Sequence, residues 1–122
     1  MAIKRYHEAK RLSKIVVSGQ TVYLAGQTAS ENLDADIKGQ TRTVLGKIDA
    51  LLADAGTDKS RILQAQIFLA DIKDAPGMNE VWDEWVSPEG SPARATVQGA
   101  LNSPKYLIEI LVIAETGPAA AQ

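Results

Sequence analysis

Two charged residues stand in strand-like surroundings near the end of the sequence. In "SPARATVQGALNSPKYLIEI", residues 91–110, Arg94 lies near the head of a strand of small residues and Glu109 lies inside an apolar strand. The planar guanidinium group of an arginine binds a carboxylate or a phosphate through two parallel hydrogen bonds. A glutamate beside such a ligand could orient or deprotonate a water molecule, or pass a proton to a leaving amine. The pair therefore indicates a site for a small anion with an acid–base step.

Spacing alone leaves this interpretation open, because each residue also has a structural explanation. A single arginine on a strand is usually a surface residue, and a buried glutamate usually has a structural partner. If the two strands formed a hairpin turning at residues 102–104, Glu109 would lie opposite Val97, about 10 Å along the strand from Arg94. A joint site then requires that the last strand inserts elsewhere in the sheet, or that a long arginine reaches along one face.

The alternation of strand side chains gives each of these strands two different faces. Arg94, Thr96 and Gln98 are expected on one polar face of the first strand, with small apolar residues on the other. Glu109 shares its face of the second strand with apolar residues such as Leu111. Burying a carboxylate among such side chains is costly unless a cation or hydrogen-bond donors accompany it.

Other motifs for catalysis or cofactor binding are missing from the sequence. It contains no P-loop, no Gly-x-Ser-x-Gly elbow and no Gly-x-Gly-x-x-Gly fingerprint. With no cysteine and a single histidine, His7, which we expect to be exposed, a zinc or iron site is not expected. Gly26 in "LAGQ" is either a turn or bulge glycine, the more usual role, or a place where bare backbone approaches a ligand.

The composition is that of an ordinary globular domain. The chain has 122 residues, 45% of them hydrophobic and 23% charged, which fits a single domain over residues 1–122. The net charge of −2 gives no indication of nucleic-acid binding, and the basic residues near the start are interpreted as solvated surface. There is no signal-peptide pattern and no apolar run of about 20 residues. We therefore expect a cytoplasmic protein without a membrane partner, with a frayed tail over residues 116–122.

The spacing of apolar residues predicts two helices among several strands. A stripe from Ile37 to Leu52 indicates a long amphipathic helix that ends at Gly56 in a left-handed cap. A second helix is predicted to begin at Asp74 with Pro76 in its first turn. The apolar stripe of this helix consists of Met78, Val81, Trp82 and Trp85. Such a stripe is more typical of a core or a subunit contact than of a cofactor site.

The predicted element order is β-β-β-α-β-α-β-β. Strands alternating with helices in this way favour one sheet covered on one face by both helices, an α+β or α/β layer. Nothing remains in the chain to cover the other face, so we expect identical subunits to pack against one another there.

The same residues resemble a known family. "SPARATVQGAL" followed by "YLIEILVIA" is similar to the C-terminal signature of the RidA/YjgF family of reactive enamine/imine deaminases. The similarity continues upstream through "YLAGQ", "ADAG", "IFLADIKD" and "MNEVWDEW", and so covers nearly the whole chain. The resemblance implies a chorismate-mutase-like α+β fold, mixed in its sheet, assembled as a homotrimer with three clefts between subunits. It also implies that the last strand inserts between others.

The resemblance assigns roles to individual residues. Arg94 matches the arginine that binds the substrate carboxylate, and Glu109 matches the glutamate that positions water. Gly26 and Asn79 match residues that line the cleft. The best-studied branch of the family has a tyrosine where this chain has Leu12.

A second departure lies two residues after Arg94, where that branch has a cysteine and this chain has Thr96. Both departures fall at positions that shape the pocket, so a paralogue with altered substrate preference is expected.

The activity implied is the hydrolysis of 2-imino and enamine acids, such as those derived from 2-aminoacrylate, to 2-oxo acids and ammonia. Neither a cofactor nor a metal is required. The same Arg94 would also suit a non-catalytic trimeric module that binds small carboxylates. A nuclease or translation-inhibitor role, reported for some relatives, is the weaker option because the isoelectric point is about 5.3.

Overall fold

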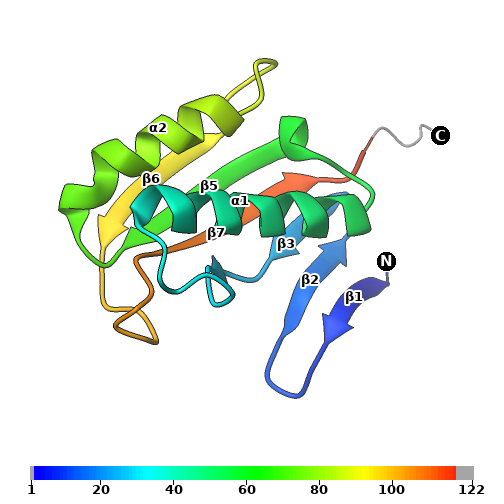
Figure 1. The fold of residues 1–122 in the computed structure, drawn as a ribbon. Helices are drawn as coiled ribbons and strands as arrows, with labels where there is room; N and C mark the ends of the chain where they lie inside the picture. Colours follow the sequence, from blue (N-terminus) through cyan, green and yellow to red (C-terminus); the bar gives the residue numbers. More distant parts are fainter. Residues whose placement is uncertain (1, 118–122) are drawn as a thin grey trace.

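The computed structural model describes residues 2–117 as one mixed sheet with two helices on one of its faces (Figure 1). The strands are β1 (Ile3–Glu8), β2 (Ser13–Ser18), β3 (Thr21–Leu24), β4 (Gln27–Thr28), β5 (Ile62–Leu69), β6 (Ala93–Gln98) and β7 (Ile108–Glu115). The helices are α1 (Ile37–Asp54) and α2 (Ala75–Trp85), with short 3-10 turns at Lys59–Arg61 and Ile72–Asp74. The predicted α+β sheet with both helices on one face is confirmed.

The last strand lies inside the sheet. The strand order is β1-β2-β3-β7-β5-β6, and β4 extends the pairing of β7 beyond β3. A hairpin between β6 and β7 is therefore wrong, because β5 separates them: β6 runs parallel to β5, and β7 runs antiparallel to it. The parallel pair is possible because α2 provides the crossover connection between β5 and β6. The insertion implied by the family resemblance is what the structure shows.

The core lies between the sheet and the helices. The side chains of β7 that face the helices, Ile108, Ile110, Val112 and Ala114, are completely or almost completely buried. The stripe predicted for α1 packs on them, since Val44, Leu45, Ile48, Leu51 and Leu52 are buried as well. This layer fixes β7, the strand on which Glu109 lies, at the centre of the molecule.

The helix ends follow their local sequence. Asp36 accepts a hydrogen bond from the Gly39 amide at 2.9 Å and so begins α1, and Gly56 after its end has a φ of +79°, as predicted. Asp74 occupies the position before α2, but its side chain makes no capping hydrogen bond. Asp71 instead caps the preceding 3-10 turn, accepting from the Lys73 amide at 2.9 Å.

The N-terminal segment forms a strand that the sequence did not indicate. Four strands precede α1 rather than three, because Ile3–Glu8 pairs with β2. Most of its side chains are exposed, which agrees with the predicted solvated surface, and His7 is exposed with its Nε2 2.9 Å from an Asp54 carboxylate oxygen. Over residues 2–117 neither helix is long and apolar enough to cross a membrane. The prediction for the C-terminal tail falls mainly on residues 118–122, outside the described residues.

Candidate active site

Glu109 lies on the open face of the sheet, directly against Gly26. It is half-buried and pairs with Thr28 of β4 on one side and Phe68 of β5 on the other. A Cβ atom placed on Gly26 would lie 2.1 Å from Glu109 Oε2 and 3.0 Å from its Cδ. The φ angle of Gly26 is not positive, so its backbone is not in the left-handed region. Its role is therefore to leave room for the carboxylate rather than to make a turn.

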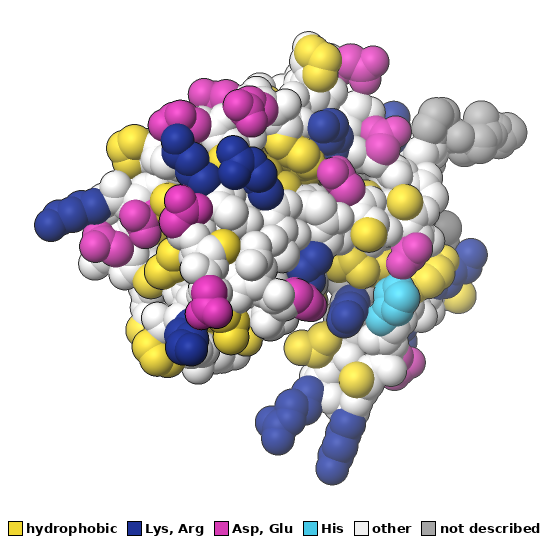
Figure 2. All heavy atoms as spheres, in the orientation of Figure 1, with side chains coloured by type: hydrophobic (Ala, Val, Ile, Leu, Met, Phe, Trp, Pro, Cys, Tyr) yellow, Lys and Arg dark blue, Asp and Glu magenta, His cyan; other side chains and the backbone are white. Residues whose placement is uncertain are grey.

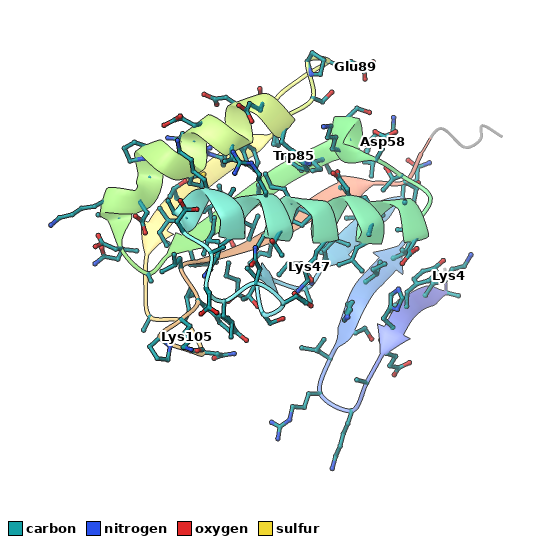
Figure 3. The ribbon with its side chains drawn as sticks, viewed as in Figure 1. Lys4, Lys47, Asp58, Trp85, Glu89 and Lys105 are labelled. Atoms are coloured by element: carbon teal, nitrogen blue, oxygen red, sulfur yellow. The ribbon has the colours of Figure 1, made fainter. Side chains whose placement is uncertain are left out.

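Lys47 of α1 holds β4, one of the two strands that flank Glu109. Lys47, labelled in Figure 3, donates to the Thr28 carbonyl at 2.8 Å and to a Glu31 carboxylate oxygen at 2.9 Å. The hydrogen bond from Lys47 lowers the pKa of Glu31. Because Thr28 lies opposite Glu109, this contact fixes one wall of the glutamate's surroundings.

Gln40 is a positioning residue that the sequence analysis missed. Its side chain is fully buried, and its Nε2 donates to the Lys105 carbonyl at 3.0 Å while its Oε1 accepts from the Leu107 amide at 2.9 Å. These bonds hold the segment that leads into β7. The signal in the sequence that could have identified Gln40 is its place on the apolar stripe of α1, four residues before Val44.

Arg94 lies on the other face of the sheet, in contact with α2. Its guanidinium carbon is 5.2 Å from the centroid of the Trp82 ring, and its Nη1 is 4.0 Å from Met78 Sδ. Among residues 2–117, neither Arg94 nor Glu109 takes part in an ion pair. Arg94 is thus a cation supported by apolar and aromatic groups, with its charge available to a ligand.

Two side-chain oxygens, one on β6 and one on α2, lack a hydrogen-bond partner among residues 2–117. Asn79 Oδ1 and Thr96 Oγ1 are both buried and unpaired. Thr96 lies on the same face of β6 as Arg94, two residues along, and Asn79 follows Met78 in α2. Buried polar groups are nearly always paired, so these two oxygens are acceptors that a further donor could satisfy.

Within one chain, Arg94 and Glu109 do not meet. Arg94 is level with Ala65 of β5, which is level with Val112 of β7, and Glu109 is three residues from Val112. The two residues are therefore separated by two strand spacings and three residues, about 10 Å in each direction, and they point to opposite faces. An arginine reaching along one face to the glutamate is excluded.

Leu12 is also remote from the other predicted site residues in a single chain. It lies in the turn between β1 and β2 with 53% of its surface exposed. That hairpin forms one edge of the sheet, and β6 with Arg94 forms the other (Figure 1).

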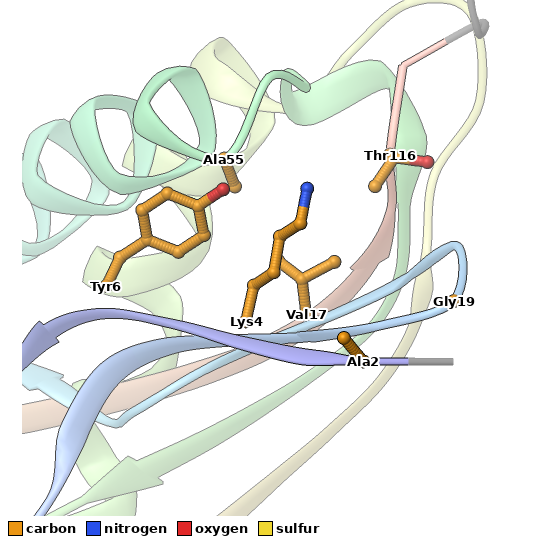
Figure 4. Close-up of a pocket in the computed structure, with 7 residues that line it drawn as sticks. All are labelled: Ala2, Lys4, Tyr6, Val17, Gly19, Ala55 and Thr116. Carbon is orange, nitrogen blue, oxygen red and sulfur yellow. The ribbon is translucent and has the colours of Figure 1, made fainter.

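Two hollows within one chain lie away from these residues. One of about 360 Å³ lies between the N-terminal hairpin and the end of α1, where Lys4 extends between Tyr6 and Thr116 (Figure 4). Another of about 320 Å³ lies between the helices beside Trp85. Glu109, on the open face, and Arg94, at the outer edge, line neither of these two hollows. Among the described residues, no three acidic or histidine side chains are grouped as metal ligands would be.

Comparison with known proteins gives a consistent result. The family described as Endoribonuclease L-PSP matches residues 2–116. The chain is 45% identical over 114 residues to a RutC family protein of Haemophilus influenzae and 46% identical to the RutC family protein YoaB of Escherichia coli. Each alignment covers 93% of this chain and 98% of the relative.

The solved structures agree. A member of the YjgF protein family from Neisseria meningitidis superposes with a TM-score of 0.91 at 35% identity, covering 95% of this chain and 96% of the other. YyfA of Yersinia pestis, a member of the Rid protein family, gives 0.81 at 32% identity, with 89% and 90% covered. Since sequence and fold match over nearly their whole length, the chain belongs to the RidA/YjgF/RutC family.

Proposed function

We propose that this protein hydrolyses 2-imino acids, formed from enamines such as 2-aminoacrylate, to 2-oxo acids and ammonia. The observation that carries the proposal is the contact between Glu109 and Gly26. A half-buried carboxylate, unpaired with any cation among the described residues, lies against backbone from which the Cβ is missing. Such a carboxylate is free to hold a water molecule and to move its protons.

Arg94 would bind the substrate carboxylate. Its guanidinium group has no acidic partner among the described residues, so a ligand carboxylate would not compete with a protein carboxylate. The unpaired oxygens of Asn79 and Thr96 favour a ligand that carries N–H or O–H donors beside its carboxylate. A 2-imino acid in its protonated form, and the carbinolamine derived from it, carry such donors.

The site would lie between copies of the chain. Because Arg94 and Glu109 face opposite sides of the same sheet, one ligand can meet both only if they come from different copies. The open face offers a surface for association, since Tyr23 and Val97 are 46% and 47% exposed there and Leu111 and Ile113 are only half-buried. We propose the homotrimer that the family resemblance implies.

The reaction balances without any other reactant. Glu109 takes a proton from water while the oxygen adds to the imine carbon, and the C=N double bond becomes a C–N single bond. Glu109 returns this proton to the nitrogen of the resulting carbinolamine, and the C–N bond breaks to release ammonia. The hydroxyl group becomes the C=O of the 2-oxo acid by giving up its proton, which ammonia takes up as ammonium. Arg94 holds the carboxylate during both steps, so the contribution of the protein is positioning and proton transfer.

The test is to supply 2-imino acids from an amino-acid oxidase and to follow loss of the imine. We expect Glu109→Gln to lower kcat by roughly 10²–10⁴-fold, since it removes the acid–base group, and Arg94→Ala mainly to raise KM. Glu115→Gln is the matched control, because Glu115 lies on the same face of β7 but pairs with Arg61. If the wild-type protein removes imine no faster than buffer, the proposal is wrong.

A non-catalytic carboxylate-binding module is the second candidate. It is favoured by the fact that the surroundings of Arg94 are built within one chain without Glu109. Binding of 2-oxobutyrate that depends on Arg94, together with no turnover of imine, would establish it. A ribonuclease role, which the family description names, is not proposed. Acidic and basic side chains are interspersed over the main body in Figure 2, with basic side chains gathered only at the projecting end, and the net charge is −2.

A further inference from the structure

The surroundings of Arg94 are unusual for a cation beside a protein core. Met78 and Trp82, one turn apart on α2, are 0% and 5% exposed, and both contact the guanidinium group. A cation over the face of an indole ring is attracted by the negative charge of the ring face, most strongly for tryptophan. The position of the guanidinium group is thus defined by an aromatic face rather than by an acid.

Trp82 is itself held firmly. It is buried in the core between the helices and the sheet, and its ring centroid is 5.3 Å from that of Trp85, with the planes inclined by 53°. A buried side chain in a packed interior occupies one rotamer, so the indole face presents a fixed surface. Arg94, which is on the exposed edge strand β6, would otherwise have several rotamers open to it.

An indole and a carboxylate would orient an arginine with different consequences. A carboxylate would take the N–H donors and the charge that a ligand needs. An indole contacts the guanidinium plane and leaves the N–H donors at its rim free. An arginine oriented in this way is ready for a carboxylate and has no protein anion to displace.

We infer that Trp82 is a positioning residue that holds Arg94 in the orientation required to bind the carboxylate of the substrate. The inference rests on the proposed function of Arg94 as the carboxylate-binding group. Trp82 acts through Arg94 and does not touch the reacting atoms. The affinity that depends on Trp82 should therefore be the part that depends on a ligand carboxylate.

The experiment compares two probes, 2-oxobutyrate and its neutral amide, 2-oxobutanamide, by NMR titration. We expect the wild-type protein to bind the acid at least about 10-fold more tightly than the amide and Arg94→Ala to lose this preference. Trp82→Leu should reduce the preference by about 10-fold while leaving amide affinity unchanged. Trp82→Phe, which keeps a ring and the fold, should reduce it by about 3-fold.

Val81→Ala is the control for packing. Val81 is 4% exposed on the same helix, and truncating it loosens the core while Trp82 and Met78, which contact Arg94, are kept. It should retain the wild-type preference for the acid. A purely structural role of Trp82 would weaken both probes alike, or would make Val81→Ala behave in the same way, and either result overturns the inference.

The outcomes separate this inference from the proposed function. If the acid is preferred and Trp82 variants lose the preference while no imine is hydrolysed, only the proposed reaction fails. If imine is hydrolysed and Arg94→Ala loses the preference while both Trp82 variants keep it, only the inference fails. If Trp82→Leu does not fold, Trp82→Phe measured against Val81→Ala decides the question. A wild-type protein without a preference for the acid removes the basis of both.

Discussion

The two faces of β7 differ in how completely one chain surrounds them. On the face toward the helices, Ile108, Ile110, Val112 and Ala114 are at most 1% exposed. On the open face, the alternating residues Glu109, Leu111, Ile113 and Glu115 are only half-buried. The two sets belong to the same strand and share its hydrogen bonds, so the difference comes from what covers each face.

The comparison separates stability from function. The covered face is complete within one chain and is entirely apolar, which is the pattern of a folding core. The open face mixes apolar residues with Glu109 and with Gly26, whose missing Cβ makes room for a carboxylate. Its surroundings are incomplete in one chain, as the proposed association of copies around a ligand site requires.

The largest expected effect is the difference in stability between two isoleucine-to-alanine substitutions, one on each face of β7. Ile110→Ala should lower the free energy of unfolding by about 2–5 kcal/mol, because it opens a cavity in a fully buried site. Ile113→Ala should cost markedly less for the chain itself and should weaken association between copies. Chemical denaturation at one protein concentration and sedimentation measure the two effects. Equal losses of stability with unchanged mass would mean that the two faces do not differ in this way.

A smaller structural change should have a specific effect on the open face. Gly26→Ala places a methyl group where Glu109 Oε2 now lies, and the flexible end of the glutamate has to move. We expect the fold to persist and imine turnover to fall by about 100-fold, since misplacing a catalytic group by about 1 Å has effects of that size. Turnover and circular dichroism are measured on the same samples.

Gly46→Ala is the matched control for Gly26→Ala. A Cβ atom on Gly46 meets nothing within 4 Å, and this glycine lies in the middle of α1. Alanine there should raise stability by about 1 kcal/mol and leave turnover unchanged. If Gly26→Ala retains full turnover, the contact between Gly26 and Glu109 is not part of the active site.

The fold was largely accessible from the sequence because its signals are local. The stripe of α1, the left-handed Gly56 and the alternation of β6 and β7 each depend on residues close together in the chain, and each appears in the structure as predicted. The position of β7 depends on pairing with β3, β4 and β5, which are remote in sequence. Spacing left a hairpin and an insertion elsewhere in the sheet both open, and only the family resemblance implied the insertion.

The site was accessible only in part, for the same reason. Arg94 and Glu109 could be singled out as charges in apolar strands, and alternation gave each its neighbours correctly. That they face opposite sides of one sheet depends on the register through β5. Gln40 was missed because its partners, the backbone of Lys105 and Leu107, are more than 60 residues away along the chain.

The smallest expected effect concerns two carboxylates away from the sheet whose pKa values are shifted in opposite directions. Asp58 accepts hydrogen bonds from Ser60, which lower its pKa, whereas burial and the nearby Asp71 raise the pKa of Asp74. A raised pKa means that the ionised Asp74 destabilises the folded state above its unfolded value of about 3.8, and that this penalty disappears below it. Asp74→Asn should therefore add a few tenths of a kcal/mol to the free energy of unfolding at pH 7 and nothing at pH 3.5. The gain at pH 7 is small because the substitution also removes the favourable contact of the carboxylate with the N-terminal end of the helix dipole.

Asp58→Asn should lower the free energy of unfolding at pH 7 by a similar small amount, because Asp58 is exposed and its hydrogen bonds compete with water. This effect should fade as the pH falls through the lowered pKa of Asp58. Urea denaturation across this pH range measures both, and a stability loss for Asp74→Asn at pH 7 would show that its carboxylate supports α2 after all.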